Sequence, residues 1–172
     1  MANPDKKVKE NIPGKFFVDT TCINCDACRK FAPSIFDDQG EFSYVKLQPS
    51  SSQEELESKM ALLACPVGSI GMIGDKDLRD ARKSFPVPLD GPVYLNGFND
   101  EKTFGADSYF IKSTKGNWLI DSPRYVTDLV KAFESMGGIA YIFISHKDDI
   151  GNSAQYAKHF NAKRIINKYD IK

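Results

Sequence analysis

The chain has 172 residues, of which 41% are hydrophobic and 12% are aromatic. Lysine and arginine together number 23, as do aspartate and glutamate, so the net charge gives no reason to expect binding to nucleic acid or to an anionic membrane. The sequence offers no run of about 18 apolar residues that would serve as a membrane span, and its length favours two small domains over one.

We predict that residues 1–14 form an N-terminal arm. They contain Pro4, Pro13 and Gly14 with few apolar residues, which is typical of a segment that runs over the surface. Residues 1–11 have neither the apolar core of a signal peptide nor the character of a transit peptide. We therefore expect a cytoplasmic protein.

Residues 15–74 are predicted to form the first domain, built from short elements around a loop rich in cysteine. Ser52 and Glu55 have the spacing of a capping box, and the helix that follows is expected to end at Cys65 and Pro66. The other predicted elements are a strand at 15–18, a helical turn at 27–31, a strand pair at 35–37 and 41–46, and a strand at 69–73.

Residues 75–92 are charged and proline-rich, and we interpret them as a linker. Strands are expected at 93–95, 108–112 and 118–121. A helix is expected to begin at Ser122 and Pro123 and to end at Gly137. Residues 139–145 are almost continuously apolar, as a strand buried on both faces requires, and a helix at 153–160 and a strand at 164–166 follow. This alternation predicts parallel strand pairing in a second domain, 93–172.

All four cysteines of the chain fall into one pattern. Cys22, Cys25 and Cys28 are spaced by two residues, and Cys65 follows after 36 further residues. Three closely spaced thiolates can wrap one face of a cubane while a distant fourth closes the opposite corner. The pattern predicts one 4Fe-4S cluster with these four ligands. Cys25 favours this type over 3Fe-4S, which lacks a ligand at the middle position.

Four cysteines also have two other common uses in proteins, disulfide bonds and a structural zinc site. Three cysteines in one loop pair poorly as disulfides, and a cytoplasmic chain keeps its thiols reduced. Structural zinc normally takes two separate pairs of ligands, whereas the division here is three plus one. Both alternatives fit the spacing less well than an iron-sulfur cluster.

The cysteine triplet, read together with Cys65-Pro66-Val67-Gly68-Ser69-Ile70, resembles the single-cluster ferredoxin family. Residues 18–28, read with Ala32-Pro33 and Leu62-Leu63-Ala64-Cys65-Pro66, more narrowly resemble the ferredoxin half of cyanobacterial and plastid proteins in which a ferredoxin is joined to a metallo-β-lactamase-like domain. Residues 104–109, 119–124 and 145–149 resemble successive motifs of that second domain. The resemblance implies an α+β protein: a small ferredoxin-like α/β domain with one cluster, then a partial metallo-β-lactamase-like α/β sheet layer.

The second domain lacks the hydrolytic metal motif of that superfamily. His146 lies where the first ligand is expected, but Lys147, Asp148 and Asp149 follow in place of the other motif histidines. A catalytic metal needs at least three ligands and an open position for water. We therefore interpret His146, Asp148 and Asp149 as a turn at the end of a strand. His159 is expected to be an ordinary helix residue and Trp118 a packing residue.

The leading hypothesis for function is one-electron transfer through the cluster, with redox proteins as partners and with no catalytic residue. Four carboxylates near the cysteine loop, Asp19, Asp26, Asp37 and Asp38, are candidates for an acidic docking face. One alternative is a metal-dependent hydrolase or redox enzyme that uses the second domain. Another is a structural or sensing iron-sulfur protein. A sheet layer that ends early leaves an uncovered face, so a homodimer through the second domain is a further expectation.

Overall fold

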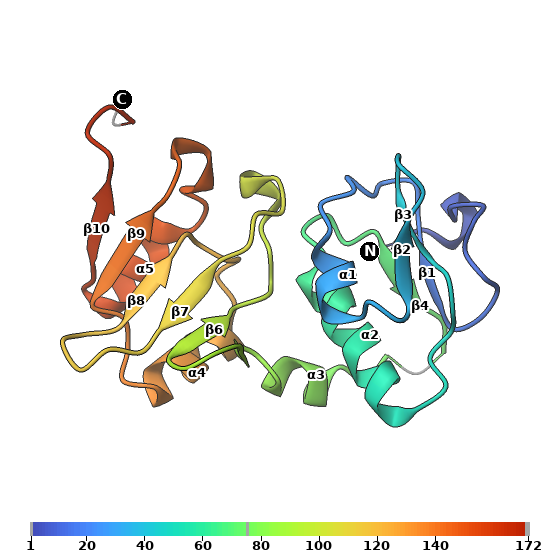
Figure 1. Ribbon diagram of the computed structural model, residues 1–172, viewed down its shortest axis with the longest axis horizontal. Helices are drawn as coiled ribbons and strands as arrows, with labels where there is room; N and C mark the ends of the chain where they lie inside the picture. Colours follow the sequence, from blue (N-terminus) through green and yellow to red (C-terminus); the bar gives the residue numbers. More distant parts are fainter. Residues whose placement is uncertain (1, 75, 171–172) are drawn as a thin grey trace. The chain divides into compact units, whose positions relative to one another are not determined.

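The computed structural model describes residues 2–74 and 76–170. The chain divides into two compact units that meet in sequence between Ser84 and Phe85 (Figure 1). One unit has two small antiparallel sheets, and the other has one larger mixed sheet. The predicted α+β class is confirmed. The division falls within the expected linker, residues 75–92, where the structure has a short helix and a short strand.

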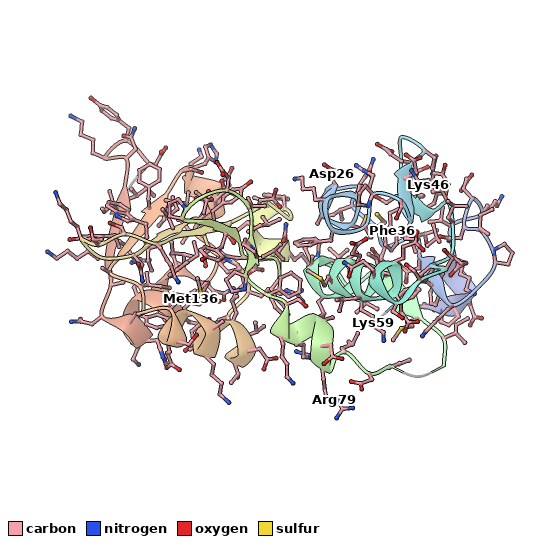
Figure 2. All side chains as sticks on the ribbon, turned by 60° about the horizontal axis from the view of Figure 1, so that its bottom comes forward. Asp26, Phe36, Lys46, Lys59, Arg79 and Met136 are labelled. Atoms are coloured by element: carbon pink, nitrogen blue, oxygen red, sulfur yellow. The ribbon has the colours of Figure 1, made fainter. Side chains whose placement is uncertain are left out.

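Within residues 2–74 and 76–84, the first unit is built from three helices, a 3₁₀ turn and four short strands. These are η1 (Pro4–Lys6), β1 (Phe16–Val18), α1 (Ala27–Phe31), β2 (Phe36–Asp38), β3 (Ser43–Val45), α2 (Ser52–Ala64), β4 (Ile70–Met72) and α3 (Arg79–Lys83). Strand β1 pairs with β4 and β2 pairs with β3, both antiparallel. Phe36 points into the interior of this unit, while Arg79 points away from it (Figure 2).

Strand β1 is buried along its whole length, and its partner β4 has a glycine opposite the central aromatic ring. Phe17 pairs in register with Gly71. A Cβ at position 71 would lie 2.2 Å from the Phe17 ring, so only glycine lets the ring lie flat against β4.

The N-terminal arm is more ordered than its composition suggested. The Asn11 side-chain oxygen accepts hydrogen bonds from the backbone of Val18 and Val45, and its nitrogen donates to the carbonyls of Val8 and Val18. One amide side chain thus accepts from backbone N–H groups of both β1 and β3, the Val18 and Val45 nitrogens. The arm therefore belongs to the packed first unit.

Helix α2 has a capping box one residue earlier than we expected. Ser51 is the N-cap, and its hydroxyl accepts from the Glu54 backbone at 3.2 Å. Glu54 in turn accepts from the backbone of Ser51. The run Ser50-Ser51-Ser52 offers three possible caps, and Glu55 is instead engaged by Lys15 and Lys59. The helix ends at Ala64, so Cys65 is delivered at its C-terminus as predicted.

As far as the structure describes it, over residues 85–170, the second unit is a six-stranded sheet with two helices. Its elements are β5 (Val87–Pro88), β6 (Val93–Leu95), η2 (Glu101–Thr103), β7 (Tyr109–Ile111), β8 (Trp118–Ile120), α4 (Thr127–Ser135), β9 (Tyr141–Ile144), η3 (Lys147–Asp149), α5 (Ser153–Phe160) and β10 (Lys163–Ile166). The strand order is β10-β9-β8-β7-β6-β5. Strand β9 pairs in parallel with both β8 and β10, which confirms the predicted alternation of strand and helix. The pairs β5–β6, β6–β7 and β7–β8 are antiparallel.

Helices α4 and α5 bury one face of this sheet (Figure 1). Phe133 of α4 stacks on Phe110 of β7 at 4.9 Å between ring centroids, and Tyr156 of α5 packs edge-on against Phe133. The side chains that point the other way are half-buried or exposed. Phe143 of β9 is 40% exposed and Ile165 of β10 is 38% exposed. Our expectation that β9 is buried on both faces is therefore wrong for Phe143, because helices cover only one side.

Helix α4 begins at Thr127, not at Ser122 and Pro123 as the capping signals predicted. The intervening backbone is held by tertiary hydrogen bonds. Arg124 donates its N–H to the carbonyl of Phe98, and the Tyr156 hydroxyl donates to the carbonyl of Arg124. These long-range bonds keep the segment out of the helix, which outweighs the local preference of a Ser-Pro pair.

Candidate metal centre

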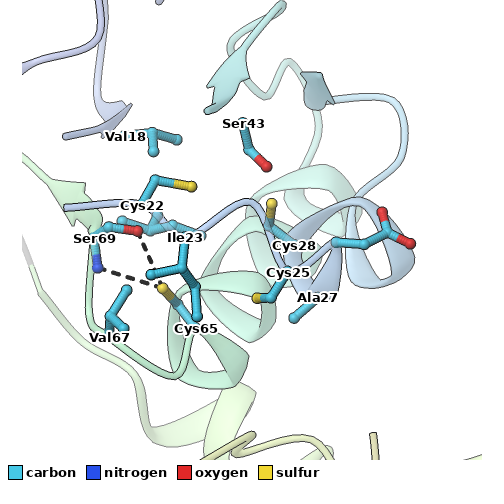
Figure 3. A pocket seen from close by; sticks show the side chains of 12 residues that line it. Val18, Cys22, Ile23, Cys25, Ala27, Cys28, Ser43, Cys65, Val67 and Ser69 are labelled. Atoms are coloured by element: carbon cyan, nitrogen blue, oxygen red, sulfur yellow. Dashed lines mark hydrogen bonds between the residues drawn. The ribbon is translucent and has the colours of Figure 1, made fainter. Parts of the chain in front are cut away.

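The four cysteines lie around one pocket of the first unit (Figure 3). Cys22 and Cys25 come from the loop after β1, Cys28 from α1, and Cys65 from the end of α2. The remaining lining is mostly apolar and consists of Val18, Ile23, Asp26, Ala27, Ser43, Val67, Ser69 and Ile70. Residues 37 positions apart in sequence thus contribute thiols to a single cavity.

The loop that carries the triplet turns sharply at two residues. Asn24 and Asp26 have φ angles of 51° and 71°, in the left-handed region that asparagine and aspartate tolerate better than other side chains. The Asn24 backbone N–H points back at Cys22 Sγ, 3.4 Å away. These turns aim three successive cysteines at the same space.

Cys65 is positioned by the end of helix α2. It is the C-cap residue, and Pro66 follows, which cannot continue a helix. The Ser69 backbone nitrogen donates to Cys65 Sγ at 3.3 Å, and the Ser69 hydroxyl lies 3.3 Å from the same sulfur. A thiolate at this position would accept two hydrogen bonds, one from the backbone N–H and one from the hydroxyl of Ser69.

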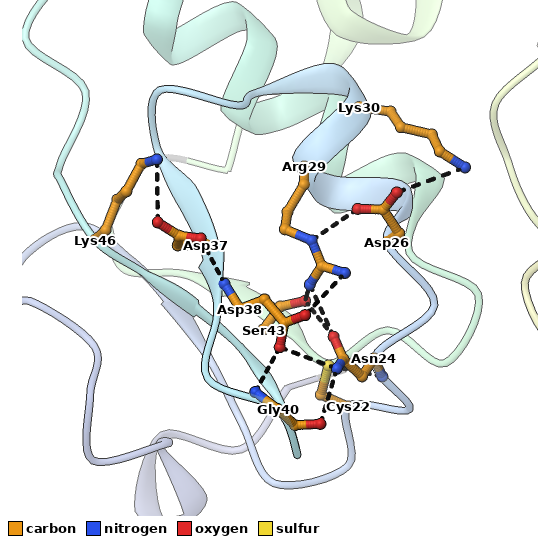
Figure 4. Close-up of polar contacts among 10 residues, drawn as sticks. All are labelled: Cys22, Asn24, Asp26, Arg29, Lys30, Asp37, Asp38, Gly40, Ser43 and Lys46. Carbon is orange, nitrogen blue, oxygen red and sulfur yellow. Dashed lines mark hydrogen bonds and ion pairs between the residues drawn. The ribbon is translucent and has the colours of Figure 1, made fainter.

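Arg29 fixes the outer side of the cysteine loop (Figure 4). Its Nε donates to Asp26 Oδ1 at 2.7 Å, and its Nη1 donates to Asn24 Oδ1 at 2.8 Å and to Ser43 Oγ at 2.6 Å. Its Nη2 lies 3.6 Å from Asp38 Oδ2. One guanidinium therefore links both left-handed residues of the loop to β2 and β3.

Ionisation of the free thiol is disfavoured at Cys25 and Cys28. Burial raises the pKa of Cys25, and burial raises the pKa of Cys28 to about 12, with the neighbouring cysteines adding to both effects. Buried thiols of this kind give up their protons when a metal supplies positive charge. The site is therefore suited to metal binding and poorly suited to a free nucleophilic cysteine.

The arrangement differs from a site for one ion. Among residues 2–74 and 76–170, no three His, Cys, Asp or Glu side chains lie close enough together to hold a single metal ion. The four cysteines lie around one pocket. Soft thiolate donors in this arrangement fit a multi-atom iron-sulfur cluster better than tetrahedral zinc.

The four candidate carboxylates near the cysteine loop differ in exposure and in their partners. Asp19 is 1% exposed and accepts hydrogen bonds from Asn3 and Thr21, so our surface assignment was wrong for this residue. Burial opposes its negative charge, but these hydrogen bonds prevail and lower its pKa. The other three carboxylates, Asp26, Asp37 and Asp38, are paired with Arg29, Lys30 or Lys46. The negative charge of these three carboxylates is therefore balanced by neighbouring cations.

The second-unit candidates do not form a metal site in the described part of the chain. His146 and Asp148 are a half-exposed pair, 3.4 Å apart, at the turn η3 after β9. Asp149 is in the same turn, and burial together with the charge of Asp121 raises its pKa. His159 of α5 forms hydrogen bonds with Glu134 of α4 and with Tyr125, which precedes α4. Trp118 stacks on Tyr141 within the sheet.

Three residues at the centre were missed by the sequence reasoning. Arg29 and Ser43 contact Asn24 of the cysteine loop, and Ser69 contacts Cys65. Ser69 lies four residues after Cys65, a spacing from which a hydrogen bond to the sulfur could have been suspected. Nothing local marks Ser43, because it comes from a different strand and only the fold brings it to the pocket.

A comparison with protein families matches this region. The family model for the 4Fe-4S single cluster domain of ferredoxin I matches residues 18–72, a range that contains all four cysteines. Over this range the first unit is similar to a ferredoxin-type iron-sulfur domain. The function that this supports, in general terms, is iron-sulfur electron transfer. No curated protein matches the chain in sequence.

Solved metallo-β-lactamases are among the structural matches. A B3 metallo-β-lactamase with an active-site glutamic acid is 19% identical, with 54% of this chain and 38% of that chain covered and a TM-score of 0.38. A metallo-β-lactamase with a HARLDQ motif from Cronobacter sakazakii is also 19% identical, with 52% and 38% covered and a TM-score of 0.37. The matches span only 38% of the length of either enzyme. The metallo-β-lactamase-like character of residues 93–172 stays a prediction.

Within the described residues, none of the helices is long and apolar enough to cross a membrane.

Proposed function

We propose that this protein transfers single electrons through one 4Fe-4S cluster held by Cys22, Cys25, Cys28 and Cys65. The observation that carries the proposal is the gathering of these four thiols around one mostly apolar pocket, inside the range that matches a ferredoxin domain. Four thiol donors suit a cubane with one ligand per iron. The presence of a cysteine at position 25 favours the four-iron over the three-iron type.

A bound cluster would supply a reversible one-electron couple, and the residues around it set the conditions for that couple. Val18, Val67 and Ile70 line the pocket and keep water from the sulfur atoms. Ile23 lines the same pocket but is 44% exposed. It is therefore the apolar side chain through which a partner would approach most closely.

The partners we propose are redox proteins that dock at the cysteine loop. Because Asp26 and Asp38 are paired with Arg29, the docking surface around Ile23 offers both signs of charge together with an apolar centre. Such a mixed surface favours a transient complex with short-range contacts more than long-range steering.

The test is spectroscopic and uses the full chain purified without oxygen. We expect about four irons per chain, one for each cysteine ligand. We also expect an EPR signal that appears on reduction with dithionite, and a reversible one-electron wave in voltammetry. Cys65→Ser should lose most of the iron. A matched variant of an unrelated polar residue, Ser135→Ala, should keep all of it.

Elemental analysis of the same sample separates the other hypotheses. Zinc bound in a fixed ratio and retained in the Cys65→Ser variant would support the hydrolase reading and contradict a purely electron-carrying role. Iron without any reversible couple would instead favour a structural or sensing cluster.

A further inference from the structure

Cys25 lies between the two left-handed residues of the cysteine loop. Asn24 before it and Asp26 after it have φ angles of 51° and 71°. Even asparagine and aspartate populate this region less readily than the right-handed one, so these conformations persist only where surrounding contacts hold them. Cys25 shares one planar peptide group with each neighbour, and the direction of its side chain therefore depends on both. Whatever holds Asn24 and Asp26 also aims the middle sulfur.

One guanidinium holds both of these neighbours (Figure 4). Arg29 Nη1 donates to Asn24 Oδ1 at 2.8 Å, and Arg29 Nε donates to Asp26 Oδ1 at 2.7 Å. The same group reaches out of the loop to Ser43 Oγ of β3, at 2.6 Å, and to Asp38 Oδ2 of β2, at 3.6 Å. The side chain of Arg29 is only 19% exposed, so water competes little for these bonds. The residues on both sides of the middle cysteine are thus tied to the β2–β3 hairpin.

Asn24 is also bound from its other end. Its Nδ2 donates to Asp38 Oδ1 at 3.1 Å and to the Gly40 carbonyl at 3.2 Å, while its Oδ1 accepts from Arg29. A lysine at position 29 could not replace the guanidinium, because its donors sit on a single nitrogen and not on a planar fork. The geometry therefore requires arginine at this position.

The other three cysteines have backbone supports of their own. The Cys22 N–H donates to the Asp19 carbonyl at 3.1 Å. Cys28 lies within helix α1, and Cys65 is the C-cap residue of α2. Cys25 is therefore the cysteine whose position depends most on the guanidinium.

We propose that Arg29 holds Cys25 on the iron that it would bind and thereby keeps the cluster in its four-iron form. This inference rests on the proposed function. The three-iron type lacks a ligand at the middle position, so the iron bound by Cys25 is the one whose loss produces it. Arg29 is a positioning residue, because a guanidinium has only donors and makes no bond to iron.

The step that Arg29 opposes is oxidative. Ferricyanide takes one electron from the oxidised four-iron cluster and becomes ferrocyanide. One iron then leaves as Fe²⁺. Its bond to the Cys25 sulfur breaks, the electron pair stays on the sulfur, and the sulfur takes a proton from water. Removal of Fe²⁺ from a core with three positive charges leaves a three-iron core with one, held by the other three cysteines. A sulfur that is held in place can rebind the iron before it escapes, whereas one that swings away cannot.

The experiment adds ferricyanide to the full-length protein, purified without oxygen, and follows the EPR signal of the oxidised three-iron cluster over time. Arg29→Lys retains the positive charge but loses the planar fork. Its three-iron signal should grow about tenfold faster than that of the wild type, the factor expected for the loss of one charge-assisted hydrogen bond. Fe²⁺ and dithionite added afterwards should restore the four-iron form in Arg29→Lys, because Cys25 is still present, but not in Cys25→Ala.

Lys30→Gln is the matched control. Lys30 belongs to the same helix and its Nζ lies 3.8 Å from Asp26 Oδ2, so this variant removes a cation beside the same carboxylate and leaves the guanidinium in place. It should convert at the rate of the wild type. Asp26→Asn keeps the test decisive if Arg29→Lys loads iron poorly. Asparagine also tolerates the left-handed region, but it gives Arg29 only a neutral acceptor. This variant should convert faster than the wild type, by a smaller factor.

The outcomes separate the two proposals. A wild-type protein that holds no four-iron cluster, or that has no reversible couple, would refute the proposed function. A normal wild-type cluster, with equal rates of conversion in the wild type, Arg29→Lys and Asp26→Asn, would overturn only the role of Arg29.

Two further results would also overturn the role of Arg29. One is the loss of all iron from Arg29→Lys without a three-iron stage, because a general weakening of the fold would then suffice. The other is a rate in Lys30→Gln as high as that in Arg29→Lys, because the charge beside Asp26 would then be enough.

Discussion

Lys15 and Glu55, 40 positions apart in sequence, are joined by an ion pair of 2.8 Å between Nζ and Oε1. Lys15 directly precedes β1, and Glu55 is in the first turn of α2. Lys59 lies 2.8 Å from the same carboxylate oxygen, one helical turn further along. The carboxylate thus connects the strand before the cysteine loop to the helix that ends at Cys65.

This pair predicts a pH dependence of stability. Hydrogen bonds from Lys15 and Lys59 lower the pKa of Glu55 from 4.5 to about 2. A lowered folded-state pKa means that the stabilisation is fully present above about pH 4.5 and is lost as the pH falls toward 2. Because the pair is partly exposed, Glu55→Gln should cost only about 0.5 to 1 kcal/mol at pH 7.

The midpoints of urea unfolding under argon test this at pH 7 and at pH 3.5. The difference in urea midpoint between the wild type and Glu55→Gln should be smaller at pH 3.5 than at pH 7. Glu57→Gln, whose carboxylate only accepts from Gln53, should behave like the wild type at both values. An equal difference at pH 7 and pH 3.5 would contradict the prediction.

Replacement of the middle cysteine should change the type of cluster. In Cys25→Ala the iron beneath position 25 loses its protein ligand, so we expect about three irons per chain instead of about four. The EPR signal should then appear in the oxidised protein and not in the reduced one. If the variant still holds four irons and gives the signal of the reduced protein, Cys25 is not a ligand.

Ser69 should influence the potential from the opposite side of the pocket. In the holo-protein its hydroxyl can only donate to Cys65, because the ligand has no proton. Ser69→Ala should therefore make the potential more negative, but the backbone N–H of residue 69 still donates to the sulfur and limits the shift. Voltammetry beside the wild type measures it, and a shift to a more positive potential would refute this view of the bond.

Gly71 should tolerate no side chain while Phe17 is present. A Cβ would meet the Phe17 ring at 2.2 Å, and the ring is 3% exposed with little room to move. Gly71→Ala should destabilise the first unit by about 1 to 3 kcal/mol through overpacking. Adding Phe17→Leu should recover part of this loss. Thermal unfolding followed by cluster absorbance checks both variants, and a Gly71→Ala protein as stable as the wild type would contradict the model of this contact.

The two units should respond separately to core mutations. Phe133 is fully buried in the second unit between Phe110 and Tyr156. Phe133→Ala should destabilise that unit by about 3 to 5 kcal/mol. The cluster potential should stay the same, because all four cysteines belong to the first unit. Circular dichroism and voltammetry on one sample measure both effects. A cluster lost together with the second unit would show that the units fold as one.

The sequence predicted most elements of this fold because their signals are local. Residues 27–31, 93–95 and 153–160 are the exact bounds of α1, β6 and α5. The predictions failed where long-range contacts compete with local preference. Ser122 and Pro123 look like a helix start, yet hydrogen bonds to Phe98 and Tyr156 hold the backbone there in a different conformation.

The cysteine spacing by itself determined the candidate ligands, since a cubane constrains which thiols can share it and the chain has no others. Only the tertiary structure decided what surrounds them. Ser43, Arg29 and the buried Asp19 have no signature in the sequence, because their roles depend on which strand and which loop the folded backbone brings together. The set of candidate ligands follows from residue chemistry and spacing, whereas the hydrogen bonds that would tune a cluster are made across distant segments and exist only after folding.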